Sequence, residues 1–191
     1  MYPGKWAELF PDKAAIVHAI NGETVTYKAL NDRSNQLAQL MWAKGLRPGD
    51  HAAIFMENNL RYFEVVWAAL RSGLYITTIN RYLTDEEAGY ILDNSEAQVI
   101  VSSKKLGEVG RALPRFAPRC HTWLMVDGTE DGYESYESAI AAYPAEPLAD
   151  EPAGQLMLYS SGTTGRPKGI VRPLPGNKIH EDAGPVGALQ K

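Results

Sequence analysis

Small hydroxyl-bearing residues and glycines crowd together between Gln155 and Ile170, in the stretch QLMLYSSGTTGRPKGI. The apolar run from Leu156 to Tyr159 predicts a buried strand that opens directly into a loop. Six loop residues with hydroxyl groups or no side chain then stand in a row: Ser160, Ser161, Gly162, Thr163, Thr164 and Gly165. A cation, Lys168, closes the stretch behind Arg166 and Pro167.

These residue types suit a polyphosphate. Gly162 and Gly165 permit backbone conformations in which successive N–H groups converge on anionic oxygens. The four hydroxyls add hydrogen-bond donors, and any one of them could also bind a phosphate-bound magnesium ion. Lys168 supplies a compact positive charge whose direction the ring of Pro167 restricts. The stretch therefore predicts a loop that binds phosphate groups.

Two other interpretations fit less well. A plain surface turn uses the same residue types, but it needs only one or two of them. The phosphate loop of GTPases and kinases has Gly-Lys five residues after its first glycine, and counting from Gly162 reaches Pro167. That loop also leads straight into a helix, which Pro173 and Pro175 do not allow here. Spacing and context therefore exclude it.

The run YSSGTTGRPKG resembles the phosphate-binding signature of the adenylate-forming (AMP-binding) enzymes, which include acyl-CoA synthetases, luciferases and the adenylation domains of peptide synthetases. A Gly-Glu-Thr-x-Thr-Tyr entry from Gly22 to Tyr27 and the Leu-Arg-Ser-Gly stretch from Leu70 to Gly73 are similar as well, so the resemblance extends from about Phe10 to Ile170. It implies that the loop wraps the β- and γ-phosphates of ATP and that Lys168 adds a charge to them. It transfers no catalytic residue and no metal ligand.

The activity that the resemblance implies is that of a two-step acid-thiol ligase of the fatty-acyl-CoA type. A carboxylate attacks the α-phosphorus of ATP in the presence of Mg²⁺, and the acyl-adenylate then passes its acyl group to coenzyme A. The family's later motifs for adenine, ribose and the C-terminal catalytic lysine have no counterpart before Lys191. The chain by itself is therefore expected to be inactive or nearly so, and the sequence does not indicate which carboxylic acid is used. The alternatives are a non-catalytic nucleotide-binding remnant and an adenylation domain that acylates a carrier-protein thiol.

Strand-like and helix-like patterns alternate along the chain. Strands are predicted at 14–20, 24–27, 51–56, 74–79, 97–101, 122–126 and 155–159. Helices are predicted from Thr26 to Lys44, from Asn58 or Asn59 to Gly73, from Thr84 to Asn94, near 105–112 and around 136–143, with a capping box at Thr84 and Glu87. This order favours an α/β fold, a mostly parallel sheet with helices on both faces. By resemblance it is the incomplete first part of the large N-terminal domain of the adenylate-forming fold.

The domain organisation follows from the same patterns. Residues 1–170 are expected to form a partial N-terminal AMP-binding domain, in which residues 143–154, rich in Pro, Ala and acidic residues, are a solvated connector. Residues 171–191, rich in Pro and Gly, are expected to be an unfinished tail, with the C-terminal domain absent.

Composition narrows the classes of partner. The 191 residues carry a formal net charge of −4 with a pI near 5.6, which argues against a nucleic-acid partner. A single cysteine, Cys120, excludes an internal disulfide, and the four histidines have no metal-ligand spacing. No stretch has the length of a signal peptide core or a membrane span, so a cytoplasmic, soluble chain of unknown oligomeric state is expected. Trp67 and Tyr90 are interpreted as core residues.

Overall fold

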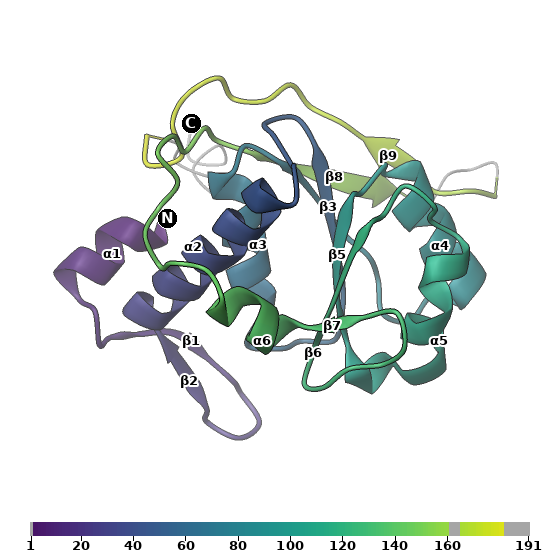
Figure 1. Ribbon diagram of the computed structural model, residues 1–191, viewed down its shortest axis with the longest axis horizontal. Coiled ribbons are helices and arrows are strands. Elements are labelled where there is room, and N and C mark those ends of the chain that lie inside the picture. The colour runs from purple at the N-terminus through teal and green to yellow at the C-terminus, as the bar shows by residue number, and fades with distance from the viewer. Residues whose placement is uncertain (1, 161–164, 182–191) are drawn as a thin grey trace.

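A seven-stranded sheet lies at the centre of the computed structural model, which describes residues 2–160 and 165–181 (Figure 1). The strand order is β7-β6-β5-β3-β4-β8-β9, and β1 and β2 form a separate antiparallel hairpin. Neighbouring strands of the large sheet are parallel except for β9, which is antiparallel to β8. The strands are Ala14–Val17 (β1), Thr24–Thr26 (β2), His51–Phe55 (β3), Tyr75–Thr78 (β4), Val99–Ser103 (β5), Thr122–Val126 (β6), Glu134–Ser135 (β7), Gln155–Ser160 (β8) and Lys168–Ile170 (β9).

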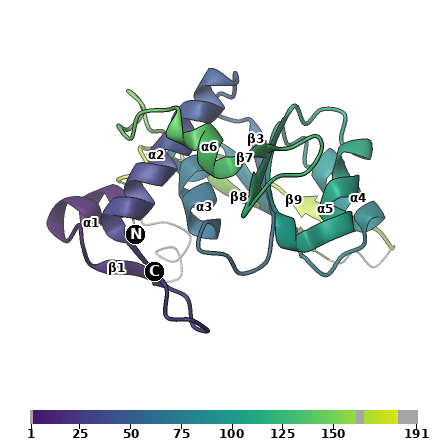
Figure 2. The same ribbon diagram turned by 60° about the horizontal axis from the view of Figure 1, so that its bottom comes forward.

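Helices cover both faces of this sheet, which confirms the predicted α/β architecture (Figures 1 and 2). The helices are Pro3–Leu9 (α1), Tyr27–Ala43 (α2), Tyr62–Arg71 (α3), Asp85–Asn94 (α4), Gly107–Ala112 (α5) and Tyr136–Ala141 (α6), with short 3₁₀ segments at Lys104–Leu106 (η1) and Leu113–Arg115 (η2). Side chains alternate along β3, so that Ala52 and Ile54 face α2, α3 and α6 while Ala53 and Phe55 face α4 and η2. The strand is buried from both sides.

The helix starts follow their capping chemistry. Thr26 accepts a hydrogen bond from the backbone N–H of Ala29 and begins α2 as predicted, and Thr84 and Glu87 form the predicted capping box of α4. The predicted cap of α3 at Asn58 or Asn59 is wrong. Arg61 precedes that helix without a side-chain cap, and Asn59 instead accepts from the N–H of Arg61 in the turn before it.

Strand β5 begins and ends two residues later than predicted. Its ladder with β3 starts at the pair Ala52 and Val99 and reaches the pair Phe55 and Ser102, so two serines lie inside a strand that is buried along its whole length. Backbone pairing therefore outweighs the polarity that makes Ser102 and Ser103 look like the start of a loop.

Residues 143–154 have no helix or strand, as predicted, but they are fastened to α2. The side-chain amides of Asn35, Gln36 and Gln39 donate to the carbonyls of Ala145, Tyr143 and Glu146 at 2.6, 3.1 and 3.0 Å. Beyond β9 the chain returns to the end of this connector. The N–H of Ala153 donates to Asn177, the N–H of Ile179 donates to Glu151, both at 2.9 Å, and the side chain of Ile179 is buried.

A buried arginine fixes the chain just ahead of β8. Arg71 has no exposed surface, and its Nε lies 2.8 Å from Oε1 of Glu151. Its Nη2 donates to the hydroxyl of Tyr2 at 3.0 Å, and that hydroxyl donates to Oε2 of Glu151 at 2.6 Å. Arg71 therefore holds together three segments that are distant in sequence. This fixes the position of the chain at Glu151, four residues before β8 begins.

A second buried charge joins three helices on the same side of the sheet. The Glu64 carboxylate, in α3, accepts from Nη1 of Arg33 and of Arg61, each at 3.1 Å. Its other oxygen accepts from the hydroxyl of Tyr136 in α6 at 3.0 Å. Burial and the neighbouring carboxylate raise the pKa of Tyr136 well above its ordinary value, so that the phenol remains a donor.

Cys120 lies among the apolar residues under α4 and α5. Its side chain is buried, and burial raises the pKa of the thiol to about 12. Among the described residues, no helix combines the length and the apolar character needed to cross a membrane.

Candidate phosphate-binding site

A hairpin made of β8 and β9 carries the predicted loop. The register places Ser160, the last residue of β8, directly opposite Lys168, the first residue of β9. Two of the predicted site residues, eight positions apart in the chain, are therefore neighbours on one face of the hairpin. Of the other predicted residues, Ser161, Gly162, Thr163 and Thr164 lie outside the described residues.

Gly165 has φ +93° where the chain returns from the loop. This is a conformation that glycine adopts readily and that residues with a Cβ adopt at a cost. The backbone at residue 165 therefore has the conformation for which the sequence analysis expected a glycine.

The hairpin lies at an edge of the sheet where ligands commonly bind. Because β8 is parallel to β4, its carboxyl end lies on the same side as the carboxyl ends of β3, β4 and β5. In open sheets of this kind, ligands bind beyond the carboxyl ends of the strands. Strand β8 therefore ends on the side of the sheet where a bound ligand is expected.

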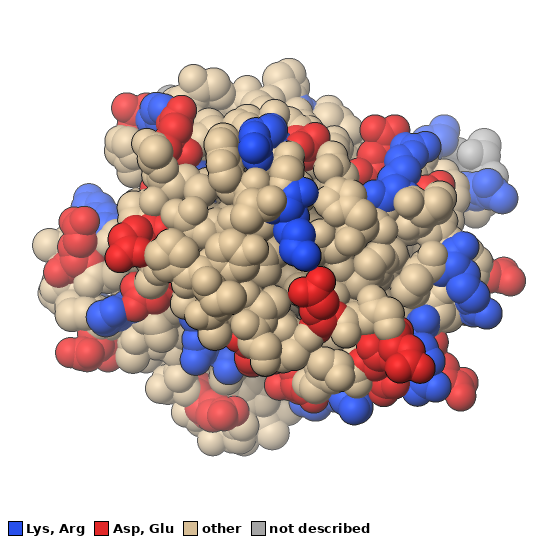
Figure 3. All heavy atoms as spheres, viewed as in Figure 1, with Lys and Arg blue, Asp and Glu red and all other residues tan. Residues whose placement is uncertain are grey.

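The cations of this hairpin are accessible. Arg166 and Lys168 are both exposed, and Lys168 makes no ion pair with any residue in the ranges 2–160 and 165–181. On the face seen in Figure 3, basic and acidic side chains are interspersed, and several basic ones gather at the end where β9 and α4 lie. Because the Lys168 ammonium has no ion-pair partner among these residues, it can bind an anion.

Two side chains that the sequence analysis did not assign to the site contact the hairpin from α4. The hydroxyl of Tyr159 donates to Oδ1 of Asn94 at 2.8 Å, and the hydroxyl of Tyr90 reaches the carbonyl of Pro167 at 3.4 Å. Tyr90 also packs partly against the core, in agreement with its interpretation as a core residue. In the sequence, the only signal that Tyr90 and Asn94 act together was their spacing of four residues on a predicted helix.

The predicted burial of β8 is partly wrong. Met157 is buried, but Leu158 is 50% exposed, and Ile170 opposite it on β9 is 50% exposed too. Val171 follows with 53% exposure. We call Leu158, Ile170 and Val171 the apolar edge. Leu156, two residues earlier in β8, packs partly against the core cluster that includes residues of α3, whereas the three residues of the apolar edge are about half exposed.

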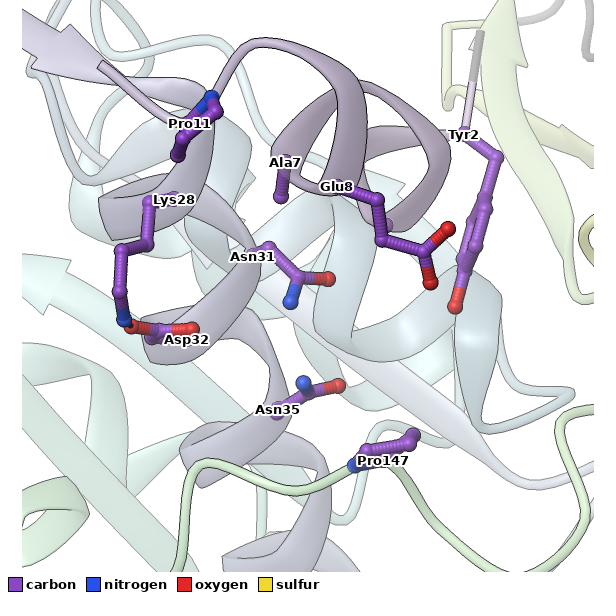
Figure 4. A pocket seen from close by; sticks show the side chains of 10 residues that line it. Tyr2, Ala7, Glu8, Pro11, Lys28, Asn31, Asp32, Asn35 and Pro147 are labelled. Carbon is purple, nitrogen blue, oxygen red and sulfur yellow. Dashed lines mark hydrogen bonds and ion pairs between the residues drawn. The ribbon is translucent and has the colours of Figure 1, made fainter.

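A cavity of about 330 Å³ lies between α1 and α2, at the opposite end of the molecule from β9 (Figures 1 and 4). In Figure 4, Glu8, Asn31 and Asn35 turn polar atoms toward it, and Pro147 of the connector closes one side. Its distance from β8 and β9 separates it from the candidate phosphate site.

Within the described part of the chain, no group of three or more His, Cys, Asp or Glu side chains is placed to hold a metal ion. His51 stacks on Tyr75 with ring centroids 4.8 Å apart, and burial lowers the pKa of this histidine.

The model of the AMP-binding enzyme family matches residues 4–178 of the chain. This chain belongs to the AMP-binding enzyme family. Two curated family members are each 31% identical to it: a 3-oxocholest-4-en-26-oate–CoA ligase of Rhodococcus rhodochrous over 86% of the chain, and the fatty acid–[acyl-carrier-protein] ligase ScoC of Streptomyces coeruleorubidus over 78%. The chain spans 31% and 28% of the length of these two proteins, which is less than a third of each.

Solved structures of family members agree with the fold. The N-terminal domain of FACL13 from Mycobacterium tuberculosis superimposes with a TM-score of 0.74 at 25% identity, over 90% of the present chain and 43% of that domain. The anthranilate CoA ligase AuaEII superimposes with a TM-score of 0.73 at 21% identity, over 88% and 34%. The adenylate-forming architecture expected from the loop motif is therefore confirmed for the part of the fold that this chain contains.

Proposed function

We propose that this chain supplies the phosphate-binding part of an ATP-dependent acid-thiol ligase. The observation that carries the proposal is the β8–β9 hairpin, which pairs Ser160 with Lys168 at the carboxyl end of a parallel strand and returns through Gly165 at φ +93°. The intervening hydroxyls and glycine complete a sequence whose residue types suit a triphosphate.

The chemistry assigned to this part is the binding of the leaving group. When a carboxylate attacks the α-phosphorus of ATP, pyrophosphate departs with its negative charge. Backbone N–H groups, the hydroxyls of Ser160, Ser161, Thr163 and Thr164, and the ammonium of Lys168 stabilise that charge if they are in place before the reaction. Magnesium, carried by the phosphate oxygens, would neutralise further charge, and a loop hydroxyl is the chain's own candidate to contact it.

The thiol acceptor and the carboxylic acid substrate are proposed from the names of the relatives. Coenzyme A is the proposed thiol, because relatives named as CoA ligases include the one from Rhodococcus rhodochrous. A carrier-protein thiol is the alternative, which the fatty acid–[acyl-carrier-protein] ligase ScoC at the same identity supports. A fatty or other apolar carboxylic acid is the proposed substrate class, on the same names.

We further propose that residues 1–170 form the first part of an N-terminal AMP-binding domain and that full activity needs more of the fold. The relatives are about three times as long as the matched region, and the apolar edge is a surface that a further part of such a domain would cover. A non-catalytic nucleotide-binding module remains the second candidate, because every residue proposed here to bind phosphate lies within the chain.

Binding of magnesium-ATP, measured by titration calorimetry, tests the proposal. Lys168→Ala is expected to weaken binding at least tenfold through loss of a charge-assisted contact. Lys5→Ala removes an exposed lysine of α1 at the far end of the molecule and is expected to change nothing. Equal affinities for wild type and Lys168→Ala would contradict the phosphate site. Carboxylate-dependent ATP–pyrophosphate exchange at ordinary enzyme rates would show that the chain needs no further part.

A further inference from the structure

One face of α4 contacts the chain on both sides of the phosphate loop. Tyr90 and Asn94 are four residues apart and therefore lie on the same side of the helix. Asn94 accepts the hydroxyl hydrogen of Tyr159, the residue before Ser160, and Tyr90 reaches the carbonyl of Pro167, the residue before Lys168. The two contacts thus bracket the loop.

A third contact involves the first cation after the loop. The guanidinium carbon of Arg166 lies 5.1 Å from the ring centroid of Tyr90, within the range in which an aromatic face attracts a cation. Arg166 directly follows Gly165 with its positive φ. A guanidinium held on the ring restrains the backbone where the loop ends.

These contacts lie on the face of the hairpin opposite to the side chains of Ser160 and Lys168. Tyr159 packs with the α4 cluster, and Gly169 lies opposite it, where a Cβ would come within 3.2 Å of the tyrosine ring. Ser160 and Lys168, one residue along each strand, face the other side. Helix α4 thus supports the hairpin from behind.

The helix itself is held firmly enough to act as a support. Its first turn has the Thr84–Glu87 capping box, and Asp85 pairs with Arg115 at 3.0 Å. Gly89 leaves no room between α4 and Phe116, since an added Cβ would lie 2.5 Å from that ring. The side chains of Tyr90 and Asn94 therefore project from a helix whose own position is fixed.

We propose that Tyr90 and Asn94 are positioning residues for the phosphate loop, and that Arg166 serves as its anchor on Tyr90 instead of as a phosphate ligand. We call the contacts of Tyr90 and Asn94 with the hairpin the clamp. Its effect on phosphate binding rests on the proposed function, but the clamp itself is present in the chain without nucleotide. The two parts are therefore tested separately.

Amide hydrogen exchange from Gly165 to Ile170, measured without nucleotide, tests the clamp. Tyr90→Leu removes the ring and the hydroxyl and is expected to speed exchange there about tenfold, whereas Tyr90→Phe keeps the ring and is expected to speed it only two- to threefold. The control is Tyr82→Leu, because the guanidinium carbon of Arg81 lies 4.4 Å from the ring centroid of Tyr82, which is 79% exposed and has no hydrogen bond to the described residues of the hairpin. Unchanged exchange in Tyr90→Leu would overturn the clamp.

Affinity for magnesium-tripolyphosphate and for magnesium-ATP tests the consequence. Tyr90→Leu and Asn94→Ala are expected to weaken both affinities about three- to tenfold. Arg166→Leu combined with Tyr90→Leu is expected to be no more than twofold worse than Tyr90→Leu alone. A loss above tenfold in Arg166→Leu with full affinity in Tyr90→Leu would make Arg166 a direct ligand and overturn the assignment. If the wild type binds neither probe, the proposed function fails, and the exchange experiment still decides the clamp.

Discussion

Glu64 illustrates how a single side chain joins three helices. Its carboxylate has no exposed surface, yet it meets two guanidinium groups and a phenol hydroxyl, so both oxygens have partners. A buried charge is tolerated when its partners are complete, and removing one partner leaves an uncompensated group. Stability in this region therefore depends on a few polar contacts as much as on the surrounding apolar side chains.

Replacing Glu64 by Leu is expected to lower the free energy of unfolding by about 3 kcal/mol, because Tyr136 and the two arginines lose their acceptor. Tyr136→Phe, which removes one hydrogen bond, is expected to cost about 1 to 2 kcal/mol. Urea denaturation measures both changes. Asp32→Ala, which breaks the exposed pair with Lys28, is the control and is expected to cost less than about 0.5 kcal/mol. A loss in Glu64→Leu no larger than in the control would show that the network contributes nothing.

Alkaline pH is expected to destabilise the chain through Cys120. Burial raises the pKa of this thiol from 9.0 to about 12, so the folded state keeps a proton that the unfolded state releases from pH 9 upward. The stabilisation from this group is complete below pH 9 and is lost as the pH rises toward 12, by up to about 1.4 kcal/mol per pH unit. Cys120→Ala is expected to flatten this slope by about one proton in urea melts between pH 9 and 11. An identical slope would show that the thiol is not responsible.

At the scale of the elements, Gly154 is where the connector enters the sheet. Its N–H donates to the carbonyl of Leu70 at 2.7 Å, and a Cβ there would lie 2.3 Å from the carbonyl oxygen of Leu74. The neighbour is backbone that belongs to the junction of α3 and β4, so it cannot move without disturbing both. Glycine is required here by close approach.

Gly154→Ala is expected to lower the free energy of unfolding by more than about 3 kcal/mol, or to prevent folding, because the methyl group displaces β8 from β4. Gly176→Ala is the matched control, since Gly176 has φ +79° but open space around it. That change is expected to cost only about 1 kcal/mol through backbone strain. Thermal melts compare the two, and equal losses would rule out the collision as the cause.

Element type was predictable wherever a local pattern dominates. The helix after Thr26 and the strand from Thr122 to Val126 were found at or within a residue of the predicted bounds, since a cap and an apolar run define them. The two-residue shift of β5 came from pairing with β3, which a single segment does not reveal. The contacts of Tyr90 and Asn94 likewise depend on how α4 lies against β8 and β9, and spacing alone gave no reason to prefer the loop over the core.

In the whole molecule, the centre of the sheet is covered on both faces, whereas the margin formed by β8 and β9 is partly exposed. The strands β3 and β5 are packed between helices, whereas the apolar edge of Leu158, Ile170 and Val171 lies half exposed. The sequence analysis expected the apolar run before the loop to be buried, because apolar residues in a strand usually are. Coverage of a strand, however, depends on the parts of the fold beside it.

This margin is expected to cause self-association of the isolated chain, because an edge strand with apolar side chains is a template for further pairing. Leu158→Thr with Ile170→Thr keeps strand-forming residues and is expected to raise the concentration at which association begins at least tenfold. Val17→Thr, a 60% exposed residue of β1, is the control. Sedimentation velocity over a concentration series gives the measurement. Unaltered association in the double variant would exclude the apolar edge as the contact.

The state of Cys120 has a practical consequence for studying the loop. This cysteine is the only one in the sequence, and because its thiol is buried and its pKa is raised to about 12, it is expected to react very slowly with maleimides at neutral pH. A cysteine introduced on an exposed surface would therefore be labelled selectively, without first removing the natural one. Fluorescent reporters attached beside β9 would then test the proposed nucleotide binding in the otherwise native chain.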